Sequence, residues 1–385
     1  MGLVMCEPIR HLYVHIPFCA AKCPYCAFVT HVGSLKLVEP YLDALLQEMT
    51  SVAAARPGGP FETVYFGGGT PGLLTPDQLG RLLAAIDRTF GLDVDAEVSF
   101  EAHPDTAKID RLRGWRGAGA TRLSIGVETT QANELMAIGR FYSADDVRRA
   151  VSSAREAGFD NINLDLIYGL PGQDEDSWAG TLEAVLALQP EHVSLYPLSI
   201  EPRTVFARQQ REGGLVVPSD ESVVHMYRRA CDELRAAGFV HYEVANWSRP
   251  GFAARHNLAY WRNHEYYGIG VGAHAYLKPY RTENERRVKR YLEVISGGAT
   301  AVVERETVGP DEELSESVML GLRLLREGLD LAETRRRFGR DLVTERAEDI
   351  NRLASRGHLI RKDERLFLSE SAVPVANEIW ALLVP

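Results

Sequence analysis

Strand-like and helix-like segments alternate along the first half of this 385-residue chain. Short apolar runs rich in β-branched residues are each followed by a stretch with the spacing of an amphipathic helix. We expect six strands, at residues 12–16, 63–66, 97–104, 121–128, 161–171 and 192–199. Nearly continuous apolar strands that alternate with helices are typical of a parallel sheet covered by helices. The pattern therefore predicts an α/β fold, an incomplete parallel (β/α)6-type barrel.

Chemically distinctive residues follow these strands where a parallel barrel places its working groups, at the C-terminal strand ends. Cys19 comes directly after the first strand, and a glycine run at residues 67–69 follows the second. Glu101 lies on the third strand, Glu128 ends the fourth and Asp165 lies on the fifth. We therefore expect these residues to meet at one mouth of the barrel.

Three cysteines within eight residues, Cys19, Cys23 and Cys26, form a C-x3-C-x2-C pattern. Thiolates held this close can bind one iron–sulfur cluster. A cubane cluster has four irons, so three cysteines leave one iron open for a small molecule. A zinc site with His31 as a fourth ligand is the alternative. The odd total of five cysteines does not indicate a disulfide framework.

The glycine run continues into Thr70 and lacks the Lys-Ser/Thr of a phosphate-binding P-loop. Bare backbone at Gly68 and Gly69 lets a ligand approach closely, so the run can cradle the amino group of a cluster-bound molecule. Alone, the same run would more often be a tight turn.

The strand-end acids can accept hydrogen bonds from an amine and from ribose hydroxyls, and Arg140 can pair with a carboxylate. Tyr13 and Tyr25 flank the cysteines and can pack on an adenine. This set suits an amino-acid nucleoside, namely S-adenosylmethionine. Salt bridges on the surface and core filling are the alternative roles for these side chains.

The residue composition of the sequence changes near residues 245 and 300, which predicts three parts. Residues 1–245 would form the barrel, and residues 246–300 an aromatic, His-rich segment and linker that close it. Residues 301–385 read as short helices and a hairpin, which predicts a C-terminal helical, winged-type domain.

Charge and hydropathy exclude some classes of protein. The net charge of -10 argues against a protein that coats nucleic acid. No apolar run is long enough for a transmembrane helix, and the N-terminus lacks the layout of a signal peptide. We therefore expect a cytoplasmic protein, with peripheral membrane contact left open.

Several segments together resemble a known family. The stretches HIPFCAAKCPYC, YFGGGTP, NINLDLIYGLPGQ, HVSLYPLSIEP and RHNLAYWRNHEYYGIGVGAHAY are similar to those of the radical S-adenosylmethionine superfamily. More narrowly, they resemble its oxygen-independent coproporphyrinogen III dehydrogenase-like group, and within it the haem-chaperone branch, HemW. The resemblance extends from about residue 10 to about residue 370.

The resemblance implies a [4Fe–4S] cluster on Cys19, Cys23 and Cys26 whose open iron binds S-adenosylmethionine. It also implies that an electron donor such as flavodoxin or ferredoxin reduces the cluster, which then cleaves the sulfonium to a 5′-deoxyadenosyl radical. The residues that would line the S-adenosylmethionine pocket are Tyr13, Tyr25, Gly68, Gly69, Thr70, Glu101, Glu128, Arg140 and Asp165.

Four departures from the family pattern bear on the activity. Glu128 stands where the family usually has Gln, and His103 replaces a commoner Asn. Phe28 occupies the position of a further cysteine of the dehydrogenase, and only 18 residues precede Cys19, so the dehydrogenase's longer arm is missing. The last two features weaken the case for coproporphyrinogen decarboxylation.

The resemblance further implies a haem site around the HNLAYW stretch. We expect the neutral imidazole of His256 to bind haem iron. Asn257, Tyr260 and Trp261 would orient it or pack on the porphyrin, and Arg255 and Arg262 would pair with the propionates. His241, His264 and His274 are rival ligands, and a hydrogen-bonded structural role for His256 is the alternative.

The function that we expect is therefore binding of haem for transfer to acceptor haemoproteins. A radical decarboxylase of coproporphyrinogen III, a radical methylase or cyclopropanase, and a structural zinc protein are the rivals. Whether the chain performs radical chemistry at all stays open at this point.

Overall fold

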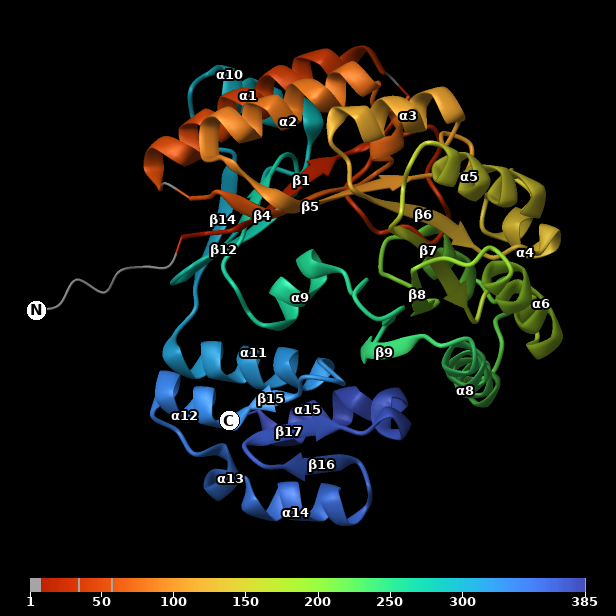
Figure 1. Cartoon of the computed structure of the whole chain (residues 1–385), viewed down its shortest axis with the longest axis vertical. Helices are drawn as coiled ribbons and strands as arrows, with labels where there is room; N and C mark the ends of the chain where they lie inside the picture. Colours follow the sequence, from red (N-terminus) through yellow and green to blue (C-terminus); the bar gives the residue numbers. More distant parts are fainter. Residues whose placement is uncertain (1–7, 34, 57, 385) are drawn as a thin grey trace, which may run out of the picture.

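The computed structural model describes residues 8–33, 35–56 and 58–384 of the chain. Figure 1 shows a larger part in which helices surround a curved sheet, and a smaller part below it formed by the C-terminal segment. None of the described helices is both long enough and apolar enough to cross a membrane.

A nine-stranded sheet frames the larger part, with the strand order β11-β1-β4-β5-β6-β7-β8-β10-β9. Neighbours from β11 to β8 pair in parallel, whereas β10 is antiparallel to both β8 and β9. The edge strands β11 and β9 do not pair with each other, so the barrel is incomplete. The bounds are β1 (His11–Ile16), β4 (Phe61–Gly68), β5 (Leu92–Ala102), β6 (Arg122–Glu128), β7 (Ile162–Tyr168), β8 (His192–Pro197), β9 (Val240–Glu243), β10 (Asn246–Ser248) and β11 (Tyr267–Ile269). The predicted α/β fold and its six parallel strands are confirmed.

One parallel strand was not expected. The three-residue strand β11 pairs with β1, outside the first predicted strand. It belongs to the aromatic segment, which starts at β10, next to the edge strand β9, and reaches the other edge through helix α9 (Arg255–Trp261). A strand of three residues is too short to show a periodicity, which is why the sequence pattern did not reveal it.

Helices cover the outer face of this sheet (Figure 1). Helix α2 shows how the sequence sets their ends: Thr75 and Gln78 form a capping box, Pro76 begins the helix and Gly91 ends it with a φ of 82°. The covering helices are α1 (Val38–Ala55), α2 (Pro76–Phe90), α3 (Ile109–Ala118), α5 (Ala144–Glu156), α6 (Glu175–Leu186) and α8 (Asp220–Ala236). Two short helices, α4 (Ala132–Ala137) and α7 (Val205–Arg211), lie in loops that follow β6 and β8.

A small antiparallel sheet leads from the barrel to the C-terminal part. It has the order β12-β13-β14, and helix α10 between β13 and β14 packs against α1. The bounds are β12 (His274–Leu277), β13 (Tyr280–Asn284), α10 (Val288–Ser296) and β14 (Val302–Thr307).

The C-terminal part contains the expected short helices and hairpin. Its three strands pair in the order β15-β17-β16, with the hairpin formed by β16 and β17. The bounds are α11 (Pro310–Arg323), β15 (Leu329–Asp330), α12 (Leu331–Phe338), α13 (Leu342–Glu345), α14 (Ala347–Ser355), β16 (Leu359–Lys362), β17 (Arg365–Leu368) and α15 (Ala376–Leu383).

Each part has its own apolar core. The larger cluster of buried side chains lies between the sheet and its helices, and the smaller one lies among α11, α14, α15 and the hairpin. Polar contacts also join the two parts: Arg323 lies 3.2 Å from buried Glu243, and Arg262 lies 2.6 Å from Glu327.

Candidate cluster and cofactor cavity

A cavity of about 580 Å³ lies at the C-terminal ends of the parallel strands. Such strand ends are where a parallel barrel presents functional side chains, because the loops that follow can vary without disturbing the sheet. Most of the predicted site residues line this cavity, namely Cys19, Cys23, Cys26, Tyr25, Gly68, Gly69, Thr70, Glu101, Glu128, Arg140 and Asp165. The prediction that residues at the ends of five different strands meet at one mouth of the barrel is therefore confirmed for these side chains.

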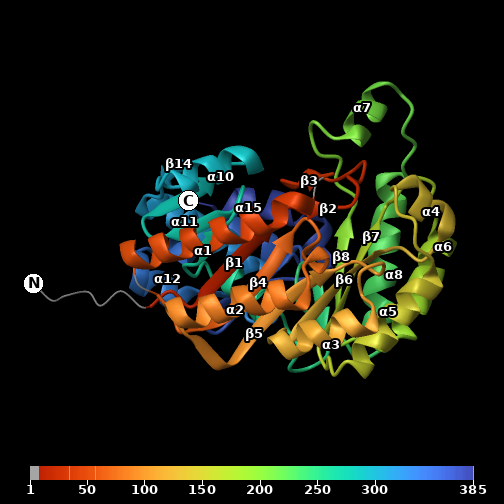
Figure 2. The ribbon, with the colours of Figure 1, turned by 90° about the horizontal axis from the view of Figure 1, so that it is seen from above.

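The cysteine loop forms one wall of the cavity. It leaves the sheet through β2 (Phe18–Cys19) and returns through β3 (His31–Val32), which pairs with β2. Figure 2 shows this loop beside α7, and the backbone N–H of Phe206 in α7 donates to the Pro24 carbonyl at 3.0 Å. The loop is thus held from its outer side while its thiols face the cavity.

The three thiols fit a cubane cluster better than a single metal ion. The Thr70 hydroxyl donates to Cys19 Sγ at 3.7 Å, and burial raises the pKa of the Cys19 and Cys23 thiols. Among the described residues no group of three or more His, Cys, Asp or Glu side chains converges tightly enough to hold one metal ion. A cubane binds each cysteine to a different iron, so it needs thiols spread around a space rather than around a point.

His31 does not join the cysteines as a zinc ligand would. Its ring meets Phe18 edge-on at 6.0 Å, and it is absent from the side chains that line the cavity. The zinc alternative therefore loses its fourth ligand.

The backbone N–H groups of the glycine run already have partners within the protein, so the run offers a ligand close approach and no free donors at these three positions. The Gly68 N–H donates to Glu101 Oε2 at 3.1 Å, the Gly69 N–H to the Ile16 carbonyl at 2.8 Å, and the Thr70 N–H to the Phe18 carbonyl at 2.8 Å. At Gly68, where φ is +111°, a Cβ would lie 2.3 Å from the His15 ring. Only glycine fits there, and contact of the run with a ligand amino group stays a prediction.

The carboxylates of Glu101 and Asp165 form a second wall of the cavity, and their hydrogen-bond donors are neutral groups. Glu101 accepts from the Tyr65 hydroxyl at 2.7 Å, and burial raises its pKa to about 7. Asp165 accepts from Ser124 at 2.9 Å and from Asn163 at 2.9 Å, and burial raises its pKa as well. Buried carboxylates held by neutral donors favour a cationic ligand, because a positive charge would replace the solvation that they have lost.

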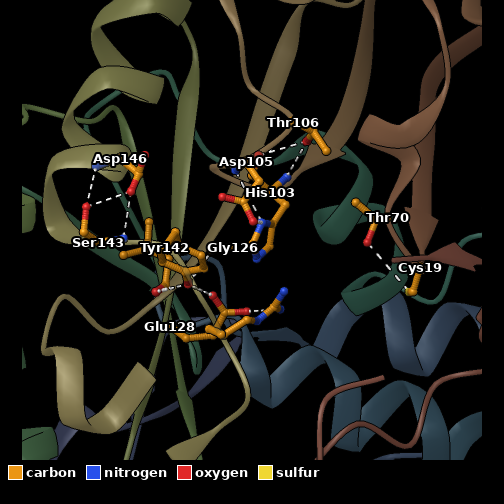
Figure 3. A network of polar contacts seen from close by, with 12 residues as sticks. Cys19, Thr70, His103, Asp105, Thr106, Gly126, Glu128, Tyr142, Ser143 and Asp146 are labelled. Atoms are coloured by element: carbon orange, nitrogen blue, oxygen red, sulfur yellow. Dashed lines mark hydrogen bonds and ion pairs between the residues drawn. The ribbon is translucent and has the colours of Figure 1, made fainter. Parts of the chain in front are cut away.

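Glu128 and Arg140 form an ion pair of 2.6 Å at the cavity wall. The Tyr142 hydroxyl donates to the other Glu128 oxygen at 2.9 Å (Figure 3). The Tyr25 hydroxyl lies 3.2 Å from the first oxygen. Glu128 also has a φ of 53°, in the left-handed region that a side chain rarely adopts. The partner of Arg140 is thus a carboxylate of this chain, where we expected that of a ligand.

Tyr13 does not reach the cavity. Its ring stacks on Tyr65 at 6.2 Å and its hydroxyl lies 2.9 Å from His15 Nδ1. Tyr65 lines the cavity in its place. The sequence signal that could have found Tyr65 is the period-2 alternation of its strand, which points Thr63, Tyr65 and Gly67 to one face.

His103 is a cavity residue that the sequence analysis noted only as a departure from the family pattern. Its ring meets Tyr142 edge-on at 4.7 Å, and burial lowers its pKa to about 3. Its Nε2 is buried without a hydrogen-bond partner among the described residues. In Figure 3 the ring lies between the Glu128–Tyr142 contact and the Thr70–Cys19 contact.

The residue expected to bind haem iron, His256, lies in the core instead. It is 1% exposed, with Nδ1 at 2.7 Å from the Thr63 hydroxyl and Nε2 at 2.8 Å from the Tyr260 hydroxyl. Both ring nitrogens are thus occupied, and the ring stacks on Tyr65 at 5.4 Å. In this structure His256 is a structural histidine, which corrects the expectation of an iron ligand.

The other residues named for haem are scattered. Arg255 donates to the Asp95 carbonyl at 2.7 Å and Arg262 pairs with Glu327 at 2.6 Å. His241 is buried and stacks on Trp247 at 4.0 Å, and His274 is exposed on β12. Asn257 and Tyr260 lie on α9, whereas Trp261 and His264 line a second cavity elsewhere in the molecule.

Comparison with known proteins places the chain in a family. Residues 13–185 match the model of the radical SAM superfamily, and residues 308–375 match that of the HemN C-terminal domain. The protein called heme chaperone HemW in Bacillus subtilis is 34% identical over 97% of this chain and 98% of its own length. The protein of that name in Mycobacterium tuberculosis is 39% identical over 83% of each chain. Among solved structures, the coproporphyrinogen III oxidase HemN of Escherichia coli superposes with a TM-score of 0.85 at 25% identity, covering 98% of this chain and 90% of that one. The chain therefore belongs to the radical SAM superfamily, in the family of the heme chaperone HemW.

Proposed function

We propose that this protein is a haem chaperone that carries a [4Fe–4S] cluster and S-adenosylmethionine and binds haem for transfer to acceptor haemoproteins. The observation that carries the proposal is the similarity over almost the full length to relatives named heme chaperone. The cavity supports the cofactor part, because three thiols and two cation-seeking carboxylates line one space.

The residues of the cavity have separate tasks in this proposal. Cys19, Cys23 and Cys26 hold the cluster, which when bound supplies an electron and an open iron to S-adenosylmethionine. Glu101 and Asp165 face the positive end of that ligand with acceptors whose orientation is fixed by hydroxyl and amide donors. These acceptors stay in place when the ligand leaves, so the wall is preorganised.

The remaining cavity residues are proposed to position S-adenosylmethionine or to neutralise the charge of the cavity wall. The Glu128–Arg140 pair keeps this wall without net charge, so a carboxylate where relatives have Gln does not repel the ligand's own carboxylate. Tyr25, Gly68, Gly69 and Thr70 are proposed to contact the same ligand. For Tyr13, which packs behind Tyr65, we propose only an indirect role through the Tyr65 ring.

Radical decarboxylation of coproporphyrinogen III is the second candidate. It is favoured by the superposition on HemN. Against it stands Phe28, 68% exposed at the cavity wall, where the dehydrogenase has a further cysteine. Anaerobic incubation of the reconstituted protein with coproporphyrinogen III, S-adenosylmethionine and a reductant would decide, because formation of protoporphyrinogen would favour this candidate over the chaperone.

Partners, location and domain limits follow as proposals. We propose an electron donor such as flavodoxin or ferredoxin, a cytoplasmic location and no nucleic-acid partner, in line with the net charge of -10. We also propose the three parts 1–245, 246–300 and 301–385. The two separate apolar cores and the path of the aromatic segment between the sheet edges support that division.

The decisive experiment is anaerobic reconstitution with iron and sulfide, followed by titration with haem. We expect iron–sulfur absorbance and then a shifted Soret band that saturates with haem. A matched variant with all three cysteines changed to alanine should lose the iron–sulfur absorbance. Wild-type protein that produces no Soret shift would overturn the chaperone proposal.

A further inference from the structure

A second cavity, of about 750 Å³, opens at the other end of the barrel. It lies where β1, β4 and β11 begin, and α11 and α12 of the C-terminal part form its far wall. Its volume is within the range of sites that bind cofactors. Such sites often lie between domains, where two surfaces enclose a ligand without either core being opened.

Two imidazoles meet at the barrel side of this cavity. His264 Nδ1 lies 3.4 Å from His11 Nε2 and the rings stack at 5.6 Å. Behind them His11 Nδ1 lies 2.9 Å from the Thr63 hydroxyl, which also contacts His256 Nδ1 at 2.7 Å. A chain of polar groups in the core thus orients the exposed His264 ring, as outer partners orient a metal-binding histidine.

The surroundings of His11 are electropositive. The guanidinium groups of Arg255, Arg10 and Arg262 lie close enough to act electrostatically on its ring. The same positive charges favour an anionic ligand nearby.

The acidic side chains of the cavity wall are all paired with cations, and two N–H donors there lack a hydrogen-bond partner among the described residues. Each lining acid has a cationic partner: Glu62 has Arg10, Glu265 has Arg56, Glu327 has Arg262, Asp330 has Arg365 and Glu333 has Arg336. By contrast, Arg10 Nε and Trp261 Nε1 are buried donors without a hydrogen-bond partner among the described residues. Unmatched donors in a wall of paired charges call for acceptors such as carboxylates on the ligand.

Apolar side chains form the rest of the lining. Trp261 comes from α9, Leu324 and Leu329 from the segment between α11 and α12, and Phe338 from the end of α12. An apolar lining with an imidazole and cationic groups matches an iron porphyrin, which is a flat apolar ring with a metal at its centre and two carboxylates at its edge.

We infer that this cavity binds haem, with His264 as the iron ligand, Trp261 and Phe338 against the ring, and the unpartnered Arg10 Nε near the propionates. This inference rests on the proposed function and adds where the haem lies. His264 makes other contacts in this structure, and the iron would displace them when it binds the imidazole. The HNLAYW stretch would serve the site through Trp261 and through the His256–Thr63–His11 chain.

Titration of the full-length protein with ferric haem tests the site, with His264→Ala as the variant and His274→Ala as the control. We expect His264→Ala to weaken haem binding by about ten-fold or more and to alter the Soret band. Added imidazole should restore the wild-type band, which a merely structural role for His264 would not predict. His274 is exposed on β12 and outside the cavity lining, so its variant should match wild type.

A second variant, Ser317→Trp, narrows the cavity from the α11 side and removes the 3.2 Å bond that Ser317 accepts from Asn263, while both histidines keep their side chains. If its unfolding curve is that of wild type, weaker haem binding supports the site. Normal haem binding by both His264→Ala and Ser317→Trp would overturn this inference while the chaperone proposal stands. An effect of Ser317→Trp alone would overturn His264 as the ligand, and wild-type protein that binds no haem would overturn the proposed function itself.

Discussion

Buried charges decide the chemistry of the cluster cavity at the scale of single residues. Glu128 is compensated by Arg140, whereas Glu101 and Asp165 have only neutral donors within hydrogen-bond distance. One wall is therefore complete without a ligand, and the other gains from a cation. The two kinds of carboxylate should respond differently to mutation and to pH.

Replacing Arg140 by alanine should lower the free energy of unfolding by about 3 kcal/mol, because it leaves the buried Glu128 carboxylate without its cation. Glu128→Gln should cost less, since the amide oxygen can still accept from Arg140, while the amide NH2 group takes the place of the oxygen that accepts from Tyr142. Urea unfolding of the reduced apoprotein measures both. The double variant should recover most of the loss, and a double variant as unstable as Arg140→Ala would contradict this explanation.

Stability should also depend on Glu101 as the pH rises. Burial raises the pKa of its carboxyl from the ordinary 4.5 to about 7 in the folded protein. Between these values the folded state holds a proton that the unfolded state has released, so its contribution is complete below about pH 4.5 and is lost as the pH rises to about 7. Relative to Glu101→Gln, wild-type protein should lose up to about 3 kcal/mol between about pH 5 and pH 8. Parallel unfolding curves of the two proteins against pH would contradict the assignment.

At the scale of elements, helix α9 connects the two cavities. Its His256 holds Thr63 and Tyr260 and stacks on Tyr65, which lines the cluster cavity, while its last residue Trp261 lines the other one. The HNLAYW stretch, which resembles a haem-binding motif, thus also holds the core together through His256. The motif is informative because it marks the element between the two sites.

His256→Ala should reduce the free energy of unfolding by about 3 kcal/mol, because it leaves the Thr63 and Tyr260 hydroxyls without their partner and opens a cavity. The fraction that folds should still show a Soret shift when haem is added, with weaker binding than wild type, because the chain that orients His264 has lost one member. Asn257→Ala, on the same helix but outside this chain of contacts, is the control. Unchanged stability with a lost Soret shift would instead restore His256 as the iron ligand.

The elements show what sequence could and could not predict. The acids Glu101, Glu128 and Asp165 were placed correctly at the cavity because parallel strands align their C-terminal ends, whatever the loops do. The direction of the His256 ring could not be predicted, since a histidine on a short helix has no periodicity that separates core from cavity. The same limit hid the Glu128–Arg140 pair, which depends on the bend at residue 128, and β11, which has only three residues.

The whole molecule has its two cavities at opposite ends of one sheet. The cluster cavity lies beyond the C-terminal strand ends, and the proposed haem cavity lies at the strand starts against the C-terminal part. None of the residues that the structure describes lines both, and Tyr65 of the first cavity is connected to His11 of the second through His256 and Thr63. This separation would keep a haem in the second cavity apart from an iron–sulfur cluster in the first.

The separation predicts that the two sites load independently. Protein with Cys19, Cys23 and Cys26 all changed to alanine should lose the iron–sulfur absorbance and yet bind haem within about two-fold of the wild-type affinity, since the changes lie in a loop at the far end of the sheet. In the converse experiment, His264→Ala should accept a full complement of iron and sulfide. Paired titrations of both variants, with iron and sulfide assays and the Soret band as readouts, measure this. Loss of haem binding in the cysteine variant would show that the cluster cavity, or a change transmitted from it through Tyr65 and His256, controls the cargo site.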